Sequence, residues 1–237
     1  MLNAIGLQNP GVEYVIENYL PTLKKYDTAI IVNAIGNTIE DYVEVCKILN
    51  ETEIDGVELN LSCPNVKAGC MAFGLSYDGI KEVTKAVRKV LDKPLIVKLS
   101  PNVTDITATA KGAEDGGADG ISLINTFTAM VIDIETRKPI LGNNTGGLSG
   151  PAIRPIAVRM TYDAAKAVKI PVLGIGGIVT GSDAIEFMLA GARAVSIGAG
   201  NFYEPDTSIK VIKGIEDYMT NHNIEDINSI VGTVEMN

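Results

Sequence analysis

The chain has 237 residues, of which 46% are apolar and 21% charged, and its formal net charge is -9. This length and apolar content are enough for one large domain or two small ones with a real core. The acidic balance argues against a nucleic-acid or anionic-membrane surface, and no apolar run reaches the roughly 18 residues that span a bilayer. Because the start lacks a basic region leading into a signal peptide, we expect a cytoplasmic protein.

Cysteine and histidine are scarce. The three cysteines, Cys46, Cys63 and Cys70, do not form a disulfide framework, and their spacing matches no zinc site, so we expect no bound metal. The single histidine, His222, lies in a polar stretch near the C-terminus. If the chain is an enzyme, we therefore expect its proton chemistry to use a group other than histidine.

Helical patterns alternate with short β-type segments along the chain. The first helical pattern covers residues 12–23, although Pro21 should kink or divide it. A second covers residues 80–91, and a third covers 185–189, which Ser182 or Thr180 could cap and Gly191 could end. The expected strands are nearly continuous apolar runs, typical of parallel strands buried on both faces: residues 28–33, 56–60, 95–99, 120–124, 172–175 and 194–197.

This alternation predicts a parallel α/β sheet, open or closed. We count six strands, whereas a (β/α)₈ barrel needs eight, so two units of about 30 residues each are unaccounted for. Residues 1–10 read as a loop that leads into a helix. The longer gap from Asn125 to Pro171 holds a candidate hairpin, residues 131–134 with 139–141, and a glycine-rich stretch at 146–150. Such an insertion after a strand end would form a lid or wall over a site.

Amide side chains recur where the expected strands end. Asn33, Asn60, Asn65 and Asn125 with Thr126 all follow strands, whose carboxyl ends meet on one side of a parallel sheet. Any one of these asparagines could serve only turn geometry. Together they indicate a flat ligand with imide or ring-amide edges, because an amide both donates and accepts hydrogen bonds.

Glycines follow the last two expected strands, at Gly174–Gly177 and Gly198–Gly200. Glycine allows backbone N–H groups to approach an anion, and this pair of positions is the usual phosphate site of β/α barrels. The sequence therefore predicts a phosphate group at these loops.

Two further residues have both a structural and a functional interpretation. Lys98 interrupts an apolar strand, where it is either ion-paired or in contact with an anionic or electron-rich cofactor. Cys63 follows a strand on the amide-lined side. It is either a small buried apolar residue or, as a thiolate, a general base or nucleophile.

Motifs along the whole chain are similar to those of a known family. The segment 60–67 (NLSCPNVK) with Ala72–Gly74 resembles the catalytic loop of class 1 dihydroorotate dehydrogenases. The segment 66–74 is similar to the NAD-linked type 1B rather than the fumarate-linked type 1A. The same likeness appears in NAIGLQNPG, VKLSPN, INT, GGLSGPA and GIGGI, which begin at residues 3, 97, 124, 146 and 174.

The resemblance implies an FMN-bound (β/α)₈ barrel that oxidises dihydroorotate to orotate in pyrimidine (UMP) synthesis. Cys63 would be the catalytic base that takes the C5 proton, while hydride passes from C6 to the flavin. The residues implied to bind substrate are Asn3, Ala4, Ile5, Gly6, Leu7, Asn60, Asn65, Asn125 and Thr126. The residues implied to bind FMN are Asn33, Asn60, Lys98, Ile124, Gly150, Gly176, Gly177, Gly198 and Ala199, with the phosphate near the last four.

Type 1B proteins of this kind pair with a second subunit that carries FAD and a 2Fe–2S cluster and passes electrons to NAD⁺. The resemblance thus implies this electron-transfer partner and a homodimer within a heterotetramer, with no nucleic-acid or membrane partner. The chain would be a single FMN-binding barrel domain, residues 1–237.

The chain departs from the family pattern at its start. Family members begin with two further βα units and a short hairpin, so we expect that Met1 is an internal methionine or that the chain is truncated. Two other functions stay open. One is a pyrimidine reductase domain similar to that of dihydropyrimidine dehydrogenase, and the other is a non-catalytic truncated fragment.

Overall fold

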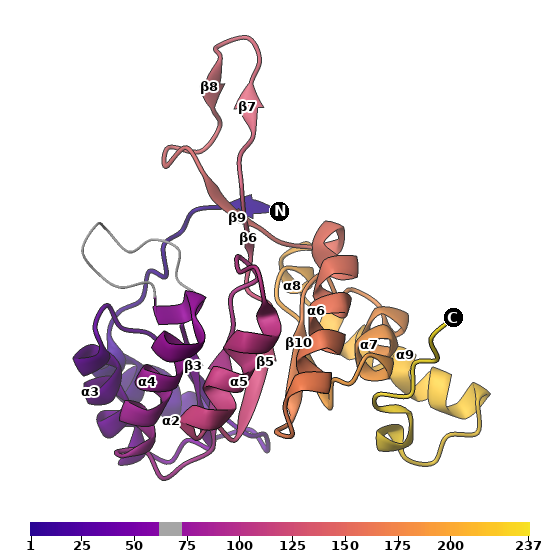
Figure 1. Cartoon of the computed structure of the whole chain (residues 1–237), viewed down its shortest axis with the longest axis horizontal. Helices are drawn as coiled ribbons and strands as arrows, with labels where there is room; N and C mark the ends of the chain where they lie inside the picture. Colours follow the sequence, from indigo (N-terminus) through magenta and orange to yellow (C-terminus); the bar gives the residue numbers. More distant parts are fainter. Residues whose placement is uncertain (62–72) are drawn as a thin grey trace. The chain divides into compact units, whose positions relative to one another are not determined.

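A computed structural model describes residues 1–61 and 73–237 (Figure 1). Its six-stranded sheet has the order β11-β10-β5-β4-β3-β2, and the recorded pairs β2–β3, β3–β4 and β10–β11 are parallel. These strands confirm the predicted parallel α/β sheet, with small differences at their ends. They are β2 (Ile31–Ala34), β3 (Gly56–Asn60), β4 (Leu95–Lys98), β5 (Gly120–Leu123), β10 (Val172–Ile175) and β11 (Ala194–Ser196).

The chain divides into two compact units. Unit 1 contains residues 1–4, 100–107 and 122–237, and unit 2 contains residues 5–99 and 108–121. The first unit includes β1 and all elements from β6 onward, and most of the elements from α1 to α5 lie in the second. The boundary between the two units passes through β5 (Gly120–Leu123) and α5 (Ile106–Gly116).

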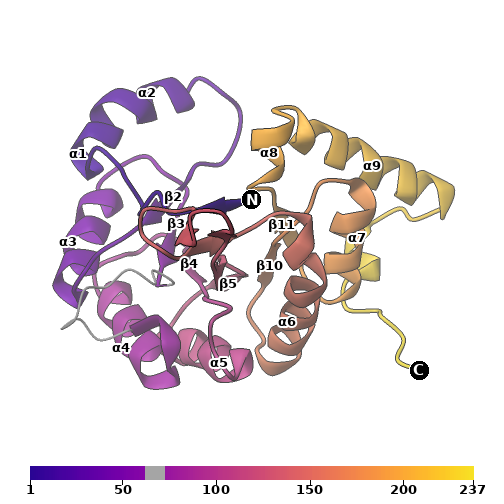
Figure 2. The same ribbon diagram turned by 90° about the horizontal axis from the view of Figure 1, so that it is seen from above.

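Unit 2 is a layer of parallel strands covered by helices. Helices α3, α4 and α5 lie outside the strands in Figure 2. The residues that face them, such as Val57, Leu59 and Val97, are fully buried. The helices return apolar side chains to the same core, which is why the layer holds together. The helical segments are α3 (Ile39–Asn50), η2 (Phe73–Leu75), α4 (Tyr77–Arg88) and α5 (Ile106–Gly116).

The first helical segment is divided, as we predicted from the presence of Pro21. It consists of α1 (Val12–Tyr14), the π-helical η1 (Val15–Tyr19) and α2 (Leu20–Leu23), in which Pro21 is the second residue. Proline has no backbone N–H and cannot extend the regular α-helical hydrogen-bond pattern. Just before it, the Leu20 N–H donates to the Val15 carbonyl, a five-residue step that widens the helix.

Helix α3 begins with a capping box. The Asp41 N–H donates to Thr38 Oγ1 (3.1 Å), and Asp41 Oδ2 accepts from the N–H groups of Asn37 (2.9 Å) and Thr38 (3.1 Å). These bonds, of which the one from the Asn37 backbone has the largest effect, lower the pKa of Asp41 from its ordinary value of 3.8. A lowered pKa in the folded state stabilises the fold above pH 3.8, and this contribution is lost as the pH falls through the folded-state pKa.

Asp41→Asn is therefore expected to lower the free energy of unfolding at neutral pH by about 0.5–1 kcal/mol. It should also make the loss of stability below pH 3.8 less steep than in the unmodified protein. Urea unfolding between pH 2.5 and 7 measures both effects. Glu40→Gln serves as the control, because Glu40 is the other acidic residue in the first turn of α3. An equal change of the pH profile in both variants would contradict the assigned role of the capping box.

Unit 1 contains a small antiparallel sheet of order β1-β9-β6, formed by β1 (Leu2–Asn3), β9 (Gly146–Leu148) and β6 (Phe127–Ala129). The prediction of a loop throughout residues 1–10 was therefore wrong at Leu2 and Asn3. Those two residues pair with Leu148 and Gly147, which are far away in the sequence. The pairing needs glycine in β9, because a Cβ on Gly146 would overlap the Asn3 carbonyl.

The hairpin predicted after β5 is present as β7 (Ile132–Asp133) and β8 (Lys138–Pro139), an arm beyond β6 and β9 in Figure 1. The rest of unit 1 packs helices on β10 and β11. Thr180 caps α7 with a second capping box, as the sequence allowed. The helical segments of this unit are η3 (Pro151–Ile153), α6 (Arg154–Ala167), α7 (Gly181–Leu189), α8 (Gly200–Tyr203), α9 (Thr207–Asn221) and η4 (Ile227–Ile230). Within the described residues, no helix has the length and apolar character to cross a membrane.

Candidate functional site

The strand ends of unit 2 bring three predicted cofactor residues onto neighbouring strands. In the parallel register Asn33 lies opposite Glu58, and Asn60 lies opposite Lys98. Asn60 Nδ2 donates to Asn33 Oδ1 (3.3 Å), so the two amides are in direct contact. We predicted that asparagine side chains from the ends of different strands lie together on one side of the sheet. This prediction is confirmed for Asn33 and Asn60.

These polar side chains share one face because side chains alternate along a strand. On β3, Val57 and Leu59 are buried against the helices, whereas Glu58 and Asn60 point the other way. Asn60 is only 3% exposed, and its backbone carbonyl accepts a hydrogen bond from the buried Tyr42 hydroxyl at 2.9 Å. Helix α3 thus holds the end of β3 in place. Lys98 is half-buried on this same polar face.

Glu58 was not among the predicted site residues. Its Oε2 accepts a hydrogen bond from Asn33 Nδ2 at 2.5 Å. The sequence did contain a signal, because Glu58 is an acidic residue between the apolar Val57 and Leu59, two positions before Asn60. Period-two spacing predicts that residues 58 and 60 share a face.

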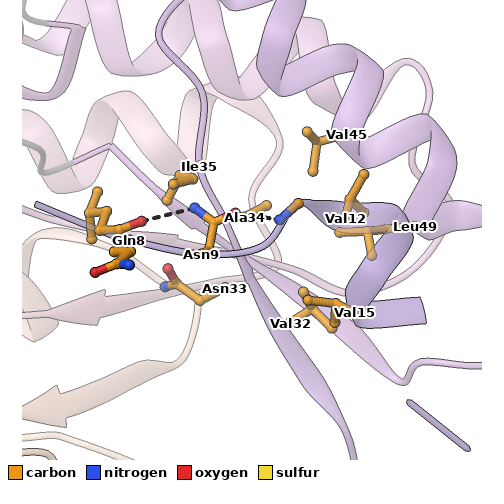
Figure 3. Close-up of a pocket in the computed structure, with 12 residues that line it drawn as sticks. Gln8, Asn9, Val12, Val15, Val32, Asn33, Ala34, Ile35, Val45 and Leu49 are labelled. Atoms are coloured by element: carbon orange, nitrogen blue, oxygen red, sulfur yellow. Dashed lines mark hydrogen bonds between the residues drawn. The ribbon is translucent and has the colours of Figure 1, made fainter. Parts of the chain in front are cut away.

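A cavity of about 270 Å³ lies beside β2 in unit 2 (Figure 3). Leu7 and Asn33, both predicted site residues, line it, but most of its wall is apolar. Its volume is below the usual range of pockets for small-molecule ligands. Val32 and Ala34 on its wall belong to the helix-covered side of the strand, so we do not assign the cavity as the cofactor site.

The loop that precedes α1 carries the predicted substrate residues Ile5, Gly6 and Leu7. Asn9 holds this loop, because its Nδ2 donates to the Leu7 carbonyl (2.8 Å) and its Oδ1 accepts from the Gly11 N–H (3.0 Å) (Figure 3). Gly6 and Leu7 have positive φ angles of 79° and 59°. Ile5 is 69% exposed, so its side chain faces solvent, whereas Leu7 lines the cavity beside β2.

In unit 1, Asn125 and Thr126 follow β5 as predicted. The Thr126 N–H donates to Asn125 Oδ1 at 2.7 Å. Asn102 holds the segment from the side, because its Nδ2 donates to the Thr126 carbonyl (3.0 Å) and its Oδ1 accepts from the Thr128 N–H (3.0 Å). Asn102 was in a recognised motif but was not predicted to have this role. The other predicted residues of this region are Asn3 on β1, Ala4 after it, and Ile124, which is buried.

The glycines after β10 and β11 were predicted to form a phosphate site. Gly176 and Gly177 have φ angles of 139° and 74°, which side chains rarely adopt. Gly177 packs directly against Gly150, another predicted cofactor residue, because a Cβ added to Gly177 would lie only 2.7 Å from the Gly150 carbonyl oxygen. Gly198, by contrast, has no atom within 4 Å of such a Cβ and borders open space, and Ala199 follows it before α8. Packing against Gly150 thus accounts for the glycine at position 177, only Gly198 borders open space, and the phosphate site stays a prediction.

An ion pair anchors the segment that follows Gly177. Arg154, at the start of α6, pairs with Asp183 on α7, and its Nε lies 3.0 Å from Glu186 Oε2. Asp183 is 5% exposed and also accepts from the Thr180 N–H at 2.9 Å. The Arg154 charge is therefore used within the fold and is not assigned to an external anion.

The predicted catalytic base Cys63 and the substrate residue Asn65 lie outside the described residues. Cys46, by contrast, is fully buried in α3, and burial raises the pKa of its thiol to about 12. It stays protonated at neutral pH and cannot act as a base. Across residues 1–61 and 73–237, no group of at least three His, Cys, Asp or Glu residues is placed to hold a metal ion.

Comparisons with known proteins identify the family to which the chain belongs. A model of the family described as "Dihydroorotate dehydrogenase" matches residues 1–219. The protein "Dihydroorotate dehydrogenase B (NAD(+)), catalytic subunit" of Alkaliphilus oremlandii is 58% identical over 232 residues, which are 98% of this chain and 77% of that protein. The protein of the same name from Thermoanaerobacter pseudethanolicus is 56% identical over 236 residues, covering 100% of this chain and 78% of the relative.

A solved structure supports the fold. The "Crystal structure of DHODH in complex with ferulenol from Eimeria tenella" matches with a TM-score of 0.78 and 21% identity, covering 98% of this chain and 70% of that one. The predicted membership of the β/α-barrel class, with part of the barrel present, is thus confirmed. The sequence matches also confirm the resemblance that the motifs indicated. The chain therefore belongs to the dihydroorotate dehydrogenase family, a family of oxidoreductases.

Proposed function

We propose that this chain oxidises dihydroorotate to orotate in pyrimidine synthesis, as the catalytic subunit of an NAD-linked dihydroorotate dehydrogenase. The observation that carries the proposal is the identity of 58% over 98% of the chain to a protein of that name. The polar face formed by Asn33, Asn60 and Lys98 supports it, because these groups suit a flat, electron-rich ring with imide edges.

FMN is the proposed cofactor, and the residues present fit it. In unit 2, the Asn33 and Asn60 amides and the Lys98 ammonium would hold the ring system. In unit 1, Ile124 and the glycine loops would make the remaining contacts, the latter with the phosphate. Bound FMN would supply the acceptor for the hydride that leaves the substrate. The loop glycines and their neighbour are Gly150, Gly176, Gly177, Gly198 and Ala199.

The chain's own residues would bind the substrate and take its proton. Cys63 is the proposed general base for the C5 proton, because no histidine other than His222 is available in the chain. The groups proposed to bind the ring and carboxylate of dihydroorotate are those of Asn3, Ala4, Ile5, Gly6, Leu7, Asn60, Asn65, Asn125 and Thr126.

The NAD-linked name of the relatives supports a partner for this subunit. We propose an electron-transfer subunit that carries FAD and a 2Fe–2S cluster and delivers electrons to NAD⁺, and a homodimer of the present chain within a heterotetramer. Residues 1–237 would act as a single FMN-binding domain in the cytoplasm.

An absorption spectrum tests the proposed function directly. The purified chain, incubated with FMN and separated from free flavin, is expected to retain flavin absorbance in the visible blue. Added orotate should shift that spectrum, whereas uracil should leave it unchanged. A response to uracil instead of orotate would favour a pyrimidine reductase, and a colourless protein would favour a non-catalytic fragment.

A further inference from the structure

Glu58 occupies a special position on the polar face of unit 2. It is half-buried on β3, two residues before Asn60 and opposite Asn33 in the strand register. Its carboxylate accepts from Asn33 Nδ2 (2.5 Å), while Asn33 Oδ1 accepts from Asn60 Nδ2 (3.3 Å). The three side chains form one directional chain of hydrogen bonds, from Asn60 through Asn33 to Glu58.

The direction of this chain follows from the chemistry of its last member. An ionised carboxylate only accepts hydrogen bonds, so it must face the NH₂ end of the Asn33 amide. That fixes the Asn33 carbonyl toward Asn60, which in turn must present its own NH₂ group. Asn33 is exposed and its amide could otherwise rotate. A hydrogen bond to a charged group favours one orientation by about 10- to 100-fold.

We propose that Glu58 is a positioning residue, which presets the amides of Asn33 and Asn60 for flavin binding. The inference rests on the proposed function, since it assumes that these two amides contact FMN. Glu58 acts through Asn33 and not by touching the flavin. The fixed Asn33 NH₂ group keeps a second hydrogen to donate, so this amide is already oriented before the ligand arrives.

Titration of the full chain with FMN, followed by quenching of flavin fluorescence, tests the proposal. Glu58→Ala is expected to weaken FMN binding about tenfold or more. Glu58→Gln should stay within about threefold of the unmodified protein, because its amide oxygen can still accept from Asn33. Glu53→Ala removes a carboxylate from an exposed position of the same unit and controls for the change of net charge.

A double-mutant cycle separates positioning from a general structural effect. In the Asn33→Ala background, Glu58→Ala is expected to change FMN affinity by less than about twofold, because the residue through which it acts is gone. A full tenfold loss in that background would overturn the proposal, and so would an unchanged affinity of Glu58→Ala in the otherwise unmodified protein.

A measurement without flavin keeps the two proposals distinguishable. In NMR spectra of the FMN-free chain, the Asn33 side-chain amide proton that donates to Glu58 is expected to move upfield in Glu58→Ala, because its hydrogen bond is lost. Unchanged Asn33 signals would overturn the role of Glu58. Failure of the unmodified chain to bind FMN would instead overturn the proposed function, and the NMR result would still decide whether Glu58 orients Asn33.

Discussion

Cys63→Ala is expected to slow the reduction of bound flavin by dihydroorotate by about 10²–10⁴-fold, while FMN stays bound. The proposed role of the Cys63 thiolate is to remove the C5 proton. The chain has one histidine, at position 222 in a polar stretch near its C-terminus, and Cys46 is too deeply buried to replace the thiolate. Stopped-flow absorbance after mixing with excess dihydroorotate measures the rate, and the flavin content of the purified variant measures binding.

Cys46→Ala is the matched control for this experiment. It removes a thiol whose pKa is raised to about 12 by burial, so it takes no part in proton transfer near neutral pH. The control should therefore reduce flavin at the unmodified rate. If Cys63→Ala were fully active at neutral pH, Cys63 would not be the base. If both variants slowed equally, the effect would be one of stability.

Phe187→Ala is expected to lower the free energy of unfolding by about 3–5 kcal/mol, a large share of the stability of an ordinary domain. The Phe187 side chain on α7 is fully buried. Its ring lies so close to β10 that a Cβ on Gly174 would overlap it, which explains the glycine at that position. Removing the ring leaves a cavity directly under the strand that leads into Gly176 and Gly177. Urea unfolding of the chain measures the loss.

Phe202→Ala provides the control, because the Phe202 side chain is 76% exposed. Its removal should change the free energy of unfolding by less than about 0.5 kcal/mol. Equal destabilisation by the two substitutions would show that Phe187 does not pack as described. A Phe187→Leu variant should recover part of the loss, since it refills some of the cavity.

Features that depend on neighbouring residues were predictable from the sequence. The six parallel strands followed from short apolar runs, the break of the first helix followed from Pro21, and the cap of α7 followed from Thr180. Each depends on local geometry. Apolar residues recur with the period of the strand or helix that they belong to, and proline breaks a helix because it lacks a backbone N–H donor. The asparagines, Lys98 and the glycines at the strand ends were likewise predictable, because their positions follow from where each apolar run ends.

Features that join distant residues were decided only by the tertiary structure. The strand β1 exists because Leu2 and Asn3 find β9, far along the chain, and two residues have no recognisable strand period. The contact between Glu58 and Asn33 likewise depends on the tertiary structure, because the two residues belong to different strands. By itself the sequence determined which residue types stand at each strand end, since local patterns encode them. Only the strand register decided which of those side chains touch, because such contacts depend on the packing of segments that are far apart in the chain.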